Sequence, residues 1–127
     1  MIDNQVTIQE LKDLVKDFCE VREWDQFHNP KELAIGISTE ANELLQIFRF
    51  KSEDDMKALM NSEKKTEVEE ELADVLYFVL RFAQMNNIDL SQAVKNKIEK
   101  NNKKYPVEKA RGCNKKYNEY SDDKKIS

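Results

Sequence analysis

The sequence predicts an all-α, four-helix bundle-like fold, and three observations support this prediction. The 127 residues include only two glycines and two prolines, too few turn-forming residues for a chain of many β-hairpins. Charged residues make up 36% of the chain and apolar residues 39%, a mixture typical of long amphipathic helices. The apolar residues recur at helical spacing in four long segments. A chain of this length forms one domain, and we expect association between copies to complete its small core.

The first two predicted helices are separated by an aromatic segment. The first helix is expected over residues 7–23, where Thr7 and Glu10 have the spacing of a capping box, in which both side chains satisfy free N–H groups. The second helix is expected over residues 29–50 and begins with Asn-Pro, an N-cap residue followed by the favoured first-turn proline. The segment Trp24–His28 between them is too aromatic for an ordinary solvated loop.

Three further segments complete the predicted helical domain, which we place at residues 1–106. Residues 52–60 form a short helix or an ordered loop that begins with capping-box spacing. Residues 63–86 begin with acidic side chains, which suit the positive end of a helix dipole, and then become strongly apolar. Residues 91–104 end shortly before a proline, because the residue that precedes proline avoids the helical conformation. Residues 107–127 are basic and show little periodicity, so we expect an extended tail there.

Composition argues against several classes of protein. No segment approaches the roughly 18 consecutive apolar residues of a membrane span. The sequence begins MIDNQVTIQE, with an early acid and no apolar stretch, so we expect no signal peptide and a cytoplasmic location. The net charge of −4 gives no general attraction to nucleic acid. The two cysteines lack metal-ligand spacing, and a single histidine argues against a His-rich metal site or a His-based catalytic triad.

Four acidic residues stand out from the solvated charge along the chain. Glu40 and Glu43 are three residues apart and share a face of the second predicted helix, and Glu71 and Asp74 repeat the pattern on the third. Both pairs border apolar stripes, where carboxylates repel one another and lose hydration. A hard divalent cation is the natural counter-charge, and Mg²⁺ prefers such oxygen ligands. The alternative is that these acids face solvent, while a di-iron centre is disfavoured because neither helix contains a histidine.

Five short motifs follow one another along most of the chain, from Trp24 to about Tyr117. They are Trp24-Asp25-Gln26-Phe27-His28, Glu40-Ala41-Asn42-Glu43, Phe50-Lys51, Glu70-Glu71-Leu72-Ala73-Asp74-Val75-Leu76, and Lys97 through Tyr105-Pro106. In this order they resemble the MazG-like, all-α nucleoside triphosphate pyrophosphohydrolases, most closely the small branch that includes the dCTP pyrophosphatases. The resemblance implies an enzyme that hydrolyses a (deoxy)nucleoside triphosphate between its α and β phosphates. The products would be a monophosphate and pyrophosphate, and the cellular role would be clearance of unwanted nucleotides.

The resemblance implies a role for each of the four acids. Glu40, Glu43, Glu71 and Asp74 match the Mg²⁺ ligands of the family. Chemistry agrees, because a metal-bound site stabilises charge on phosphoryl oxygens and activates water. Either Glu40 or Glu43 would also act as the catalytic base that orients the attacking water, and the sequence leaves the choice between them open.

The resemblance also implies which residues bind the substrate. The aromatic segment would lie against the nucleoside, and its residues are Trp24, Asp25, Gln26, Phe27 and His28. Phe50 and Phe78 stand where the family commonly has Trp and Tyr, so a flat stacking surface remains without the polar group. A third set shares one face of the last predicted helix and would bind the triphosphate: Lys97, Asn101 and Tyr105. From the residues alone, core packing of the aromatics and a solvated helix face remain alternatives.

The partners expected are the nucleotide and further copies of the chain. The resemblance implies a homodimer or homotetramer, for which Phe82, Met85 and Ile88 offer apolar surface. No membrane partner is expected. No nucleic-acid partner is expected either, because the basic tail has no aromatic residue for base stacking beyond Tyr117 and Tyr120. Two alternatives stay open. One is a related enzyme that acts on dUTP or a modified nucleotide, and the other is a non-catalytic helical interaction module whose acids bind a basic partner.

Overall fold

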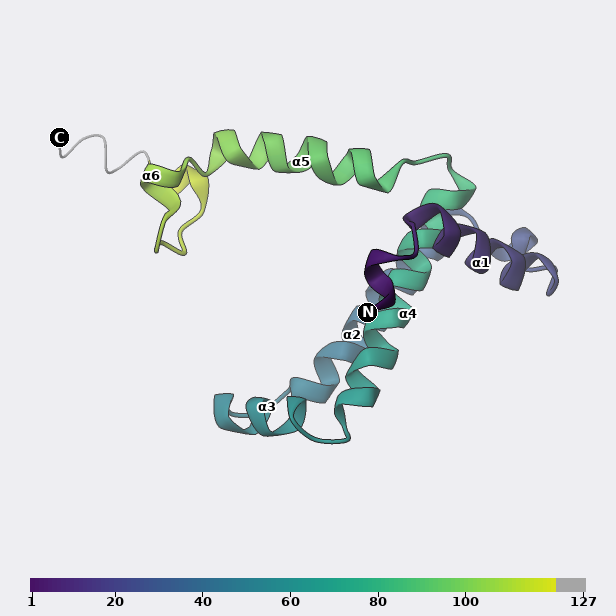
Figure 1. The fold of residues 1–127 in the computed structure, drawn as a ribbon, viewed down its shortest axis with the longest axis horizontal. Coiled ribbons are helices and arrows are strands. Elements are labelled where there is room, and N and C mark those ends of the chain that lie inside the picture. The colour runs from purple at the N-terminus through teal and green to yellow at the C-terminus, as the bar shows by residue number, and fades with distance from the viewer. Residues whose placement is uncertain (121–127) are drawn as a thin grey trace. The chain divides into compact units, whose positions relative to one another are not determined.

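The computed structural model describes residues 1–120, and within them every regular element is helical, which confirms the predicted all-α class. Figure 1 shows the α-helices, which are α1 (Ile8–Glu20), α2 (Pro30–Phe48), α3 (Glu53–Met60), α4 (Lys65–Met85), α5 (Leu90–Lys104) and α6 (Val107–Ala110). Two short 3₁₀ turns are η1 (Ile2–Asn4) and η2 (Asp25–Phe27). None of the helices described is both long and apolar enough to span a membrane.

The predicted helix starts carry the expected side-chain caps. The Thr7 hydroxyl accepts a hydrogen bond from the backbone N–H of Glu10 at 3.1 Å, and Asn29 caps α2 in the same way. Ser52 and Asp55 form a complete capping box at the start of α3, which settles that segment as a helix. The box predicted at Thr7 is wrong in one detail. The Glu10 carboxylate accepts from the Thr7 hydroxyl at 3.3 Å instead of from its backbone N–H.

Two helices end earlier than the sequence predicts. Residues 7–23 were expected to be helical, but α1 ends at Glu20 and Glu23 has a φ of 55°. Residues 29–50 were expected to continue as one helix, but α2 ends at Phe48 and Phe50 has a φ of 64°. A residue in the left-handed region cannot continue a right-handed helix. Periodicity carries no information about such residues, because apolar spacing continues past the point where the backbone turns.

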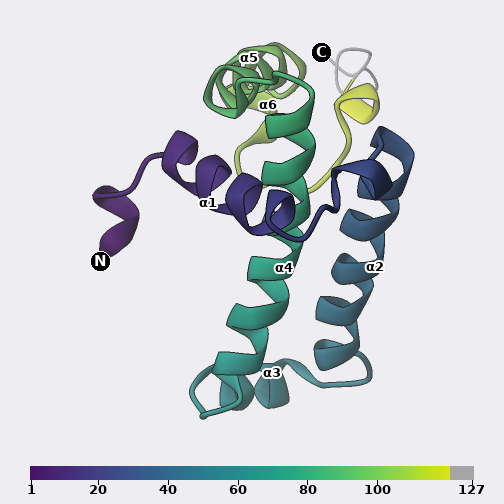
Figure 2. The same ribbon diagram turned by 90° about the vertical axis from the view of Figure 1, so that its right-hand side faces the viewer.

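The described residues form two compact units, Met1–Ile88 and a second unit that begins at Asp89. In the first unit α2 and α4 run antiparallel and side by side, with α3 at the turn between them (Figure 2). The helix α1 crosses and packs on α4. A domain boundary between residues 106 and 107 stays a prediction from the sequence.

The core of the first unit is small and joins its helices. Its buried apolar side chains are Cys19, Leu33, Leu59, Val68, Leu80 and Ala83. Lys12 of α1 is also buried, and its ammonium group donates a hydrogen bond to the carbonyl of Ile88 just after α4. By contrast, Leu72 and Leu76 on α4 are 55% and 44% exposed. Of the residues predicted to serve association between copies, Phe82 and Met85 are half-buried and Ile88 is exposed, and the association itself stays a prediction.

Gly36 sets the spacing between α2 and α4. A Cβ atom at this position would lie 2.5 Å from the ring of Phe78 on α4, well inside van der Waals contact. Only a residue without a side chain therefore allows the Phe78 ring to lie directly against the backbone of α2. The two helices pack so closely at this point because α2 contains glycine there.

The second unit contains α5, α6 and a cluster of tyrosines. Asp89 caps α5 by accepting a hydrogen bond from the backbone N–H of Gln92 at 2.9 Å. The ring of Tyr105 makes edge-to-face contacts with those of Tyr117 and Tyr120, each with 6.0 Å between centroids. Tyr120 is only 4% exposed, so the described part of the predicted tail is tied to the end of α5. Residues 121–127 of that tail lie outside the described residues.

We expect Gly36→Ala to lower the stability of the protein. Alanine favours a helix over glycine by about 1 kcal/mol, so the intrinsic effect is stabilising. The clash with Phe78 should outweigh this gain, because overpacking a well-packed contact costs about 1–3 kcal/mol. Urea or thermal unfolding followed by circular dichroism measures the change.

Ser38→Ala is the matched control for this substitution. Ser38 is exposed on the same helix, so its replacement by alanine raises helix propensity without placing an added atom against α4. We expect no loss of stability in this variant. A Gly36→Ala variant as stable as Ser38→Ala would contradict the close approach of Gly36 and Phe78.

Candidate functional site

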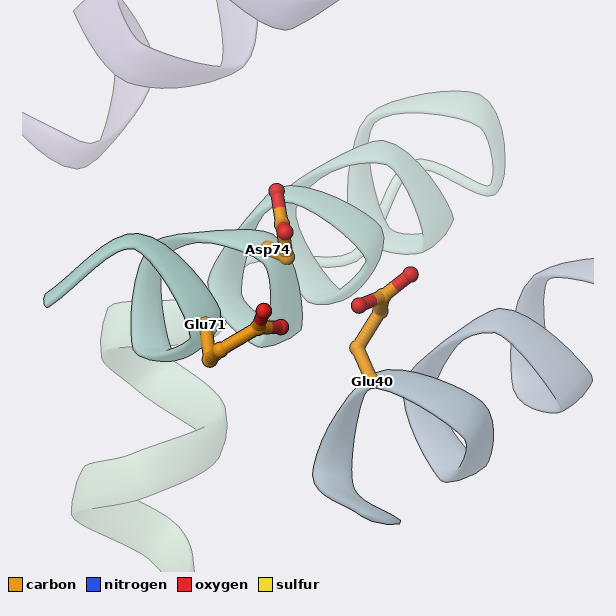
Figure 3. A group of neighbouring side chains, drawn as sticks. All are labelled: Glu40, Glu71 and Asp74. Atoms are coloured by element: carbon orange, nitrogen blue, oxygen red, sulfur yellow. The ribbon is translucent and has the colours of Figure 1, made fainter. Parts of the chain in front are cut away.

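Three carboxylates from α2 and α4 meet in the first unit. Glu40 on α2 and Glu71 and Asp74 on α4 each offer an oxygen, and these oxygens lie within 4.8 Å of one another. Figure 3 shows Glu40 extending from its helix toward the two acids on the other. Glu71 and Asp74 share a face because they are three residues apart on a helix. Glu40 lies one turn after Gly36, and Asp74 one turn before Phe78, so the close approach of the helices brings the acids together.

In the part of the chain that the structure describes, no basic side chain neutralises the charge of this acidic cluster. The Glu71 Oε2 atom is buried and has no hydrogen-bond partner. Burial raises the pKa of Glu71, and nearby negative charges raise this pKa further. The residues that carry these negative charges are, in decreasing order of their effect on the pKa, Asp74, Glu40, Glu43 and Glu67. Within residues 1–120 no lysine or arginine forms an ion pair with the three clustered acids.

These observations fit a divalent cation. An unpartnered, buried carboxylate oxygen is costly unless a positive charge faces it. Three carboxylates from two helices supply the hard oxygen donors that Mg²⁺ and similar ions prefer. The residues that could hold such an ion are Glu40, Glu71 and Asp74.

Glu43, the fourth predicted ligand, lies outside this group. It is exposed on α2, three residues after Glu40, although its charge contributes to the raised pKa of Glu71. The structure therefore brings three of the four predicted acids within reach of one ion. A role for Glu43 in metal binding or catalysis stays a prediction.

An apolar cavity adjoins the acidic cluster. Its volume is about 510 Å³, and it is lined by Leu14, Val15, Phe18, Trp24, Glu40, Asp74, Tyr77 and Phe78. Two of the clustered acids are thus part of its wall, and most of the remaining wall is aliphatic or aromatic. Pockets of this size bind small organic ligands.

The aromatic side chains in the wall of the cavity contact one another edge to face. Phe18 meets Trp24 edge to face at 5.6 Å between centroids, and Tyr77 meets Phe78 at 5.0 Å. The Tyr77 hydroxyl is 3.1 Å from the thiol of Cys19, which is fully buried. Burial and this hydrogen bond raise the pKa of Tyr77, so the hydroxyl stays protonated.

Four cavity residues were not recognised as site residues from the sequence. Helical spacing assigns Leu14, Val15 and Phe18 to the core, and Tyr77 belongs to none of the predicted site motifs. One signal was present: Tyr77 lies three residues after Asp74 and therefore on the same face of α4. The contribution of α1 depends on how it crosses α4, which no local pattern contains.

The segment that is predicted to bind the nucleoside, Trp24–His28, makes two different kinds of contact in the structure. Trp24 lines the cavity, whereas Asp25 and His28 bind the guanidinium group of Arg81 on α4. Arg81 is 1% exposed, and its Nε donates to His28 Nδ1 at 3.0 Å. One terminal nitrogen of Arg81 donates to Asp25 Oδ1. The other donates to Gln84 Oε1 at 2.7 Å. Asp25 also forms an ion pair with Arg81.

His28 is held in its neutral form by this arrangement. Burial lowers its pKa, the charge of Arg81 lowers it further, and Asp25 opposes them in part. Because Nδ1 accepts a hydrogen bond from Arg81, the neutral ring carries its proton on Nε2. The Nδ1 atom of the His28 ring is thus already hydrogen-bonded to Arg81.

The remaining predicted substrate residues do not line the cavity. Gln26 donates to the backbone carbonyl of Glu23 at 2.9 Å, and Phe27 is 63% exposed. Phe50 is 91% exposed, and the Arg49 guanidinium stacks over its ring.

The predicted phosphate-binding residues belong to the second unit. Lys97 and Asn101 lie on α5 and Tyr105 caps its end, with a spacing of four residues that keeps them on one face. Their contact with a substrate stays a prediction.

The chain is similar to several known proteins. Residues 35–120 match the model of the MazG-like family. The dCTP pyrophosphatase 1 of Mus musculus is 33% identical over 112 residues, which cover 87% of this chain and 66% of that protein. The dCTP pyrophosphatase 1 of Homo sapiens is 31% identical over 114 residues, covering 89% and 67%. This chain therefore spans about two thirds of the length of these relatives.

One solved structure supports the fold. The crystal structure of a pyrophosphatase from Archaeoglobus fulgidus superposes with a TM-score of 0.73 and 43% sequence identity. The match covers 77% of this chain and 91% of that one.

We expect Glu71→Gln to raise the melting temperature of the metal-free protein. The substitution keeps the size of the side chain and removes a charge that its neighbours repel. Because the folded-state pKa of Glu71 is raised, lowering the pH from neutral through that pKa should stabilise the wild type. The variant should lack this contribution. Melting curves in EDTA across this pH range measure both effects.

Glu70→Gln is the control, because Glu70 is an exposed acid next to Glu71 that does not contribute to its raised pKa. We expect this variant to melt like the wild type in EDTA. If Glu71→Gln melted below both of them, the proposed repulsion within the cluster would be wrong.

Proposed function

The chain belongs to the MazG-like family, and from this premise we propose that it is a Mg²⁺-dependent nucleoside triphosphate pyrophosphohydrolase. It would convert a (deoxy)nucleoside triphosphate to the monophosphate and pyrophosphate and so clear unwanted nucleotides in the cytoplasm. The observation that carries the proposal is the un-neutralised acidic cluster at the wall of an apolar, aromatic cavity. The two parts match the two ends of a nucleotide, one highly charged and one flat and largely apolar.

The acidic cluster would hold the ion. Glu40, Glu71 and Asp74 supply the ligand oxygens, and the unpartnered Glu71 Oε2 supports a positive charge at this place. A bound Mg²⁺ would stabilise negative charge on the phosphate oxygens and lower the pKa of a bound water. Without it, the carboxylates would repel a triphosphate.

Glu43 is the better placed of the two candidate bases. Glu40 belongs to the cluster, so its oxygens would be committed to the ion. Glu43 lies three residues further along the same helix, exposed and outside the cluster. We therefore propose that Glu43 accepts a proton from the attacking water and orients it, which requires a free carboxylate within reach of that water.

The cavity would hold the nucleoside. Trp24 and Phe78 offer flat faces for a base, and the Tyr77 hydroxyl is already bound to Cys19. Binding of the base would then depend on stacking and shape. The dCTP pyrophosphatases among the relatives make a pyrimidine deoxynucleotide the first substrate to test, with dUTP and modified nucleotides next.

Further copies of the chain would complete the protein. We propose a homodimer or homotetramer, supported by the exposed Leu72 and Leu76 on α4 and Val94 and Ile98 on α5. Lys97, Asn101 and Tyr105 would then contact the triphosphate, since a cation and hydrogen-bond donors bind phosphate oxygens well.

Product analysis tests the proposed reaction. Each common dNTP and NTP is incubated with the protein in Mg²⁺ or in EDTA, and the products are separated. We expect monophosphate and pyrophosphate in Mg²⁺ only. Glu71→Ala and Asp74→Ala should each lower the rate by more than about 100-fold while keeping the helical circular dichroism, because each removes a ligand oxygen.

Glu70→Ala is the matched control and should keep a rate close to that of the wild type. Diphosphate and phosphate as products would assign a different phosphohydrolase. If no nucleotide were turned over and none raised the melting temperature, the chain would be the non-catalytic interaction module. A ligand at a hundred times its dissociation constant stabilises by about 2.7 kcal/mol, a shift that is easily measured.

A further inference from the structure

We propose that Arg81 is a positioning residue that holds the segment Trp24–His28 so that Trp24 forms a wall of the cavity. Arg81 would act through Asp25 and His28 without touching the substrate. The effect on Trp24 can be measured without a nucleotide. Only the kinetic part of the proposal rests on the proposed function.

Arg81 lies on the same face of α4 as the acidic cluster. It follows Asp74 by seven residues and Phe78 by three, and both of these spacings place side chains on one side of a helix. The helix is continuous from Lys65 to Met85, so one element carries Glu71 and Asp74 of the cluster, Phe78 of the cavity wall and the guanidinium of Arg81.

The guanidinium makes three hydrogen bonds in three directions. Nε donates to His28, one terminal nitrogen to Asp25 and the other to Gln84. Gln84 is on α4 itself and orients the guanidinium, while Asp25 and His28 lie 56 and 53 residues away in the sequence. Only the planar fork of arginine offers donors in this arrangement, and a lysine ammonium at this depth could not reach all three partners.

The segment needs such an anchor because its own backbone is irregular. It follows Glu23, whose φ is 55°, and it contains only the short turn η2. At its start the Trp24 N–H donates to the Cys19 carbonyl at 3.1 Å. At its end the His28 ring contacts the Trp24 ring edge to face, with 6.3 Å between centroids. The position of His28 therefore constrains the position of the indole. Arg81 thus holds the segment at its second and last residues, Asp25 and His28.

The positions of the three side chains favour this role over direct substrate contact by Asp25 and His28. Neither residue lines the cavity, whereas Trp24 does. His28 Nδ1 and Asp25 Oδ1 are both bound to Arg81. A guanidinium that is 1% exposed cannot itself meet a ligand, so its effect must pass through the residues that it holds.

The fluorescence of Trp24 tests the proposal directly, because Trp24 is the only tryptophan in the chain. Emission and acrylamide quenching are measured without nucleotide for the wild type, Arg81→Lys, Asp25→Ala and Asp25→Asn. We expect Arg81→Lys and Asp25→Ala to shift the emission to longer wavelength and to increase quenching. Asp25→Asn keeps an acceptor oxygen and should lie closer to the wild type. The exposed Asp25 side chain makes its variants suitable if Arg81→Lys fails to fold.

Lys12→Met controls for a general loss of stability. Lys12 is another buried cation of the same unit, but it bonds to Ile88 and not to the Trp24 segment. We expect its Trp24 emission and quenching to match the wild type. Equal emission and quenching in the wild type, Arg81→Lys and Asp25→Ala would overturn the proposal.

Kinetics with the best substrate separates positioning from direct contact. Loss of the cavity wall should raise KM on the order of tenfold in Arg81→Lys and Asp25→Ala, with kcat within about threefold, because binding is weakened and the acidic cluster is intact. A raised KM in Asp25→Ala with unchanged Trp24 fluorescence would show direct contact and overturn the proposal. If the wild type turned over no nucleotide, the proposed function would fail, and the fluorescence would still decide the role of Arg81.

Discussion

The close contact between Gly36 and Phe78 is the constraint on which the site depends. It brings α2 and α4 together where Glu40 lies one turn from Gly36 and Asp74 one turn from Phe78. A larger residue at position 36 would separate the helices and with them the acids. The same Phe78 ring lines the cavity, so one packing contact sets both the spacing of the carboxylates and the shape of the adjoining pocket.

The site combines two features that are separately unfavourable. Glu71 is half-buried among like charges, its buried Oε2 atom has no hydrogen-bond partner, and the cavity beside it exposes aromatic surface. Both features are relieved by binding, one by a cation and the other by an apolar group. A metal-bound nucleotide would supply both, which is the reason for proposing it over an ion or an apolar ligand alone.

The hydrogen bonds of the buried Arg81 tie the segment between α1 and α2 to α4. The sequence resemblance assigns Asp25 and His28 to the nucleoside, yet in the structure both face a guanidinium more than 50 residues away. A residue in a binding motif can therefore support its neighbour instead of contacting the ligand. Here the supported neighbour is Trp24, which lies within the same motif and reaches the cavity.

Local features of this protein were determined by the sequence alone. The helices, their caps at Asn29 and Ser52 and the pairing of acids on single helices depend on residues three or four apart, whose geometry any helix fixes. Tertiary structure decided which helix faces meet. It brought Glu40 within reach of Glu71 and Asp74, added α1 to the cavity and left Phe50 exposed. These outcomes depend on contacts between distant segments and on backbone turns, such as those at Glu23 and Phe50, that periodicity does not record.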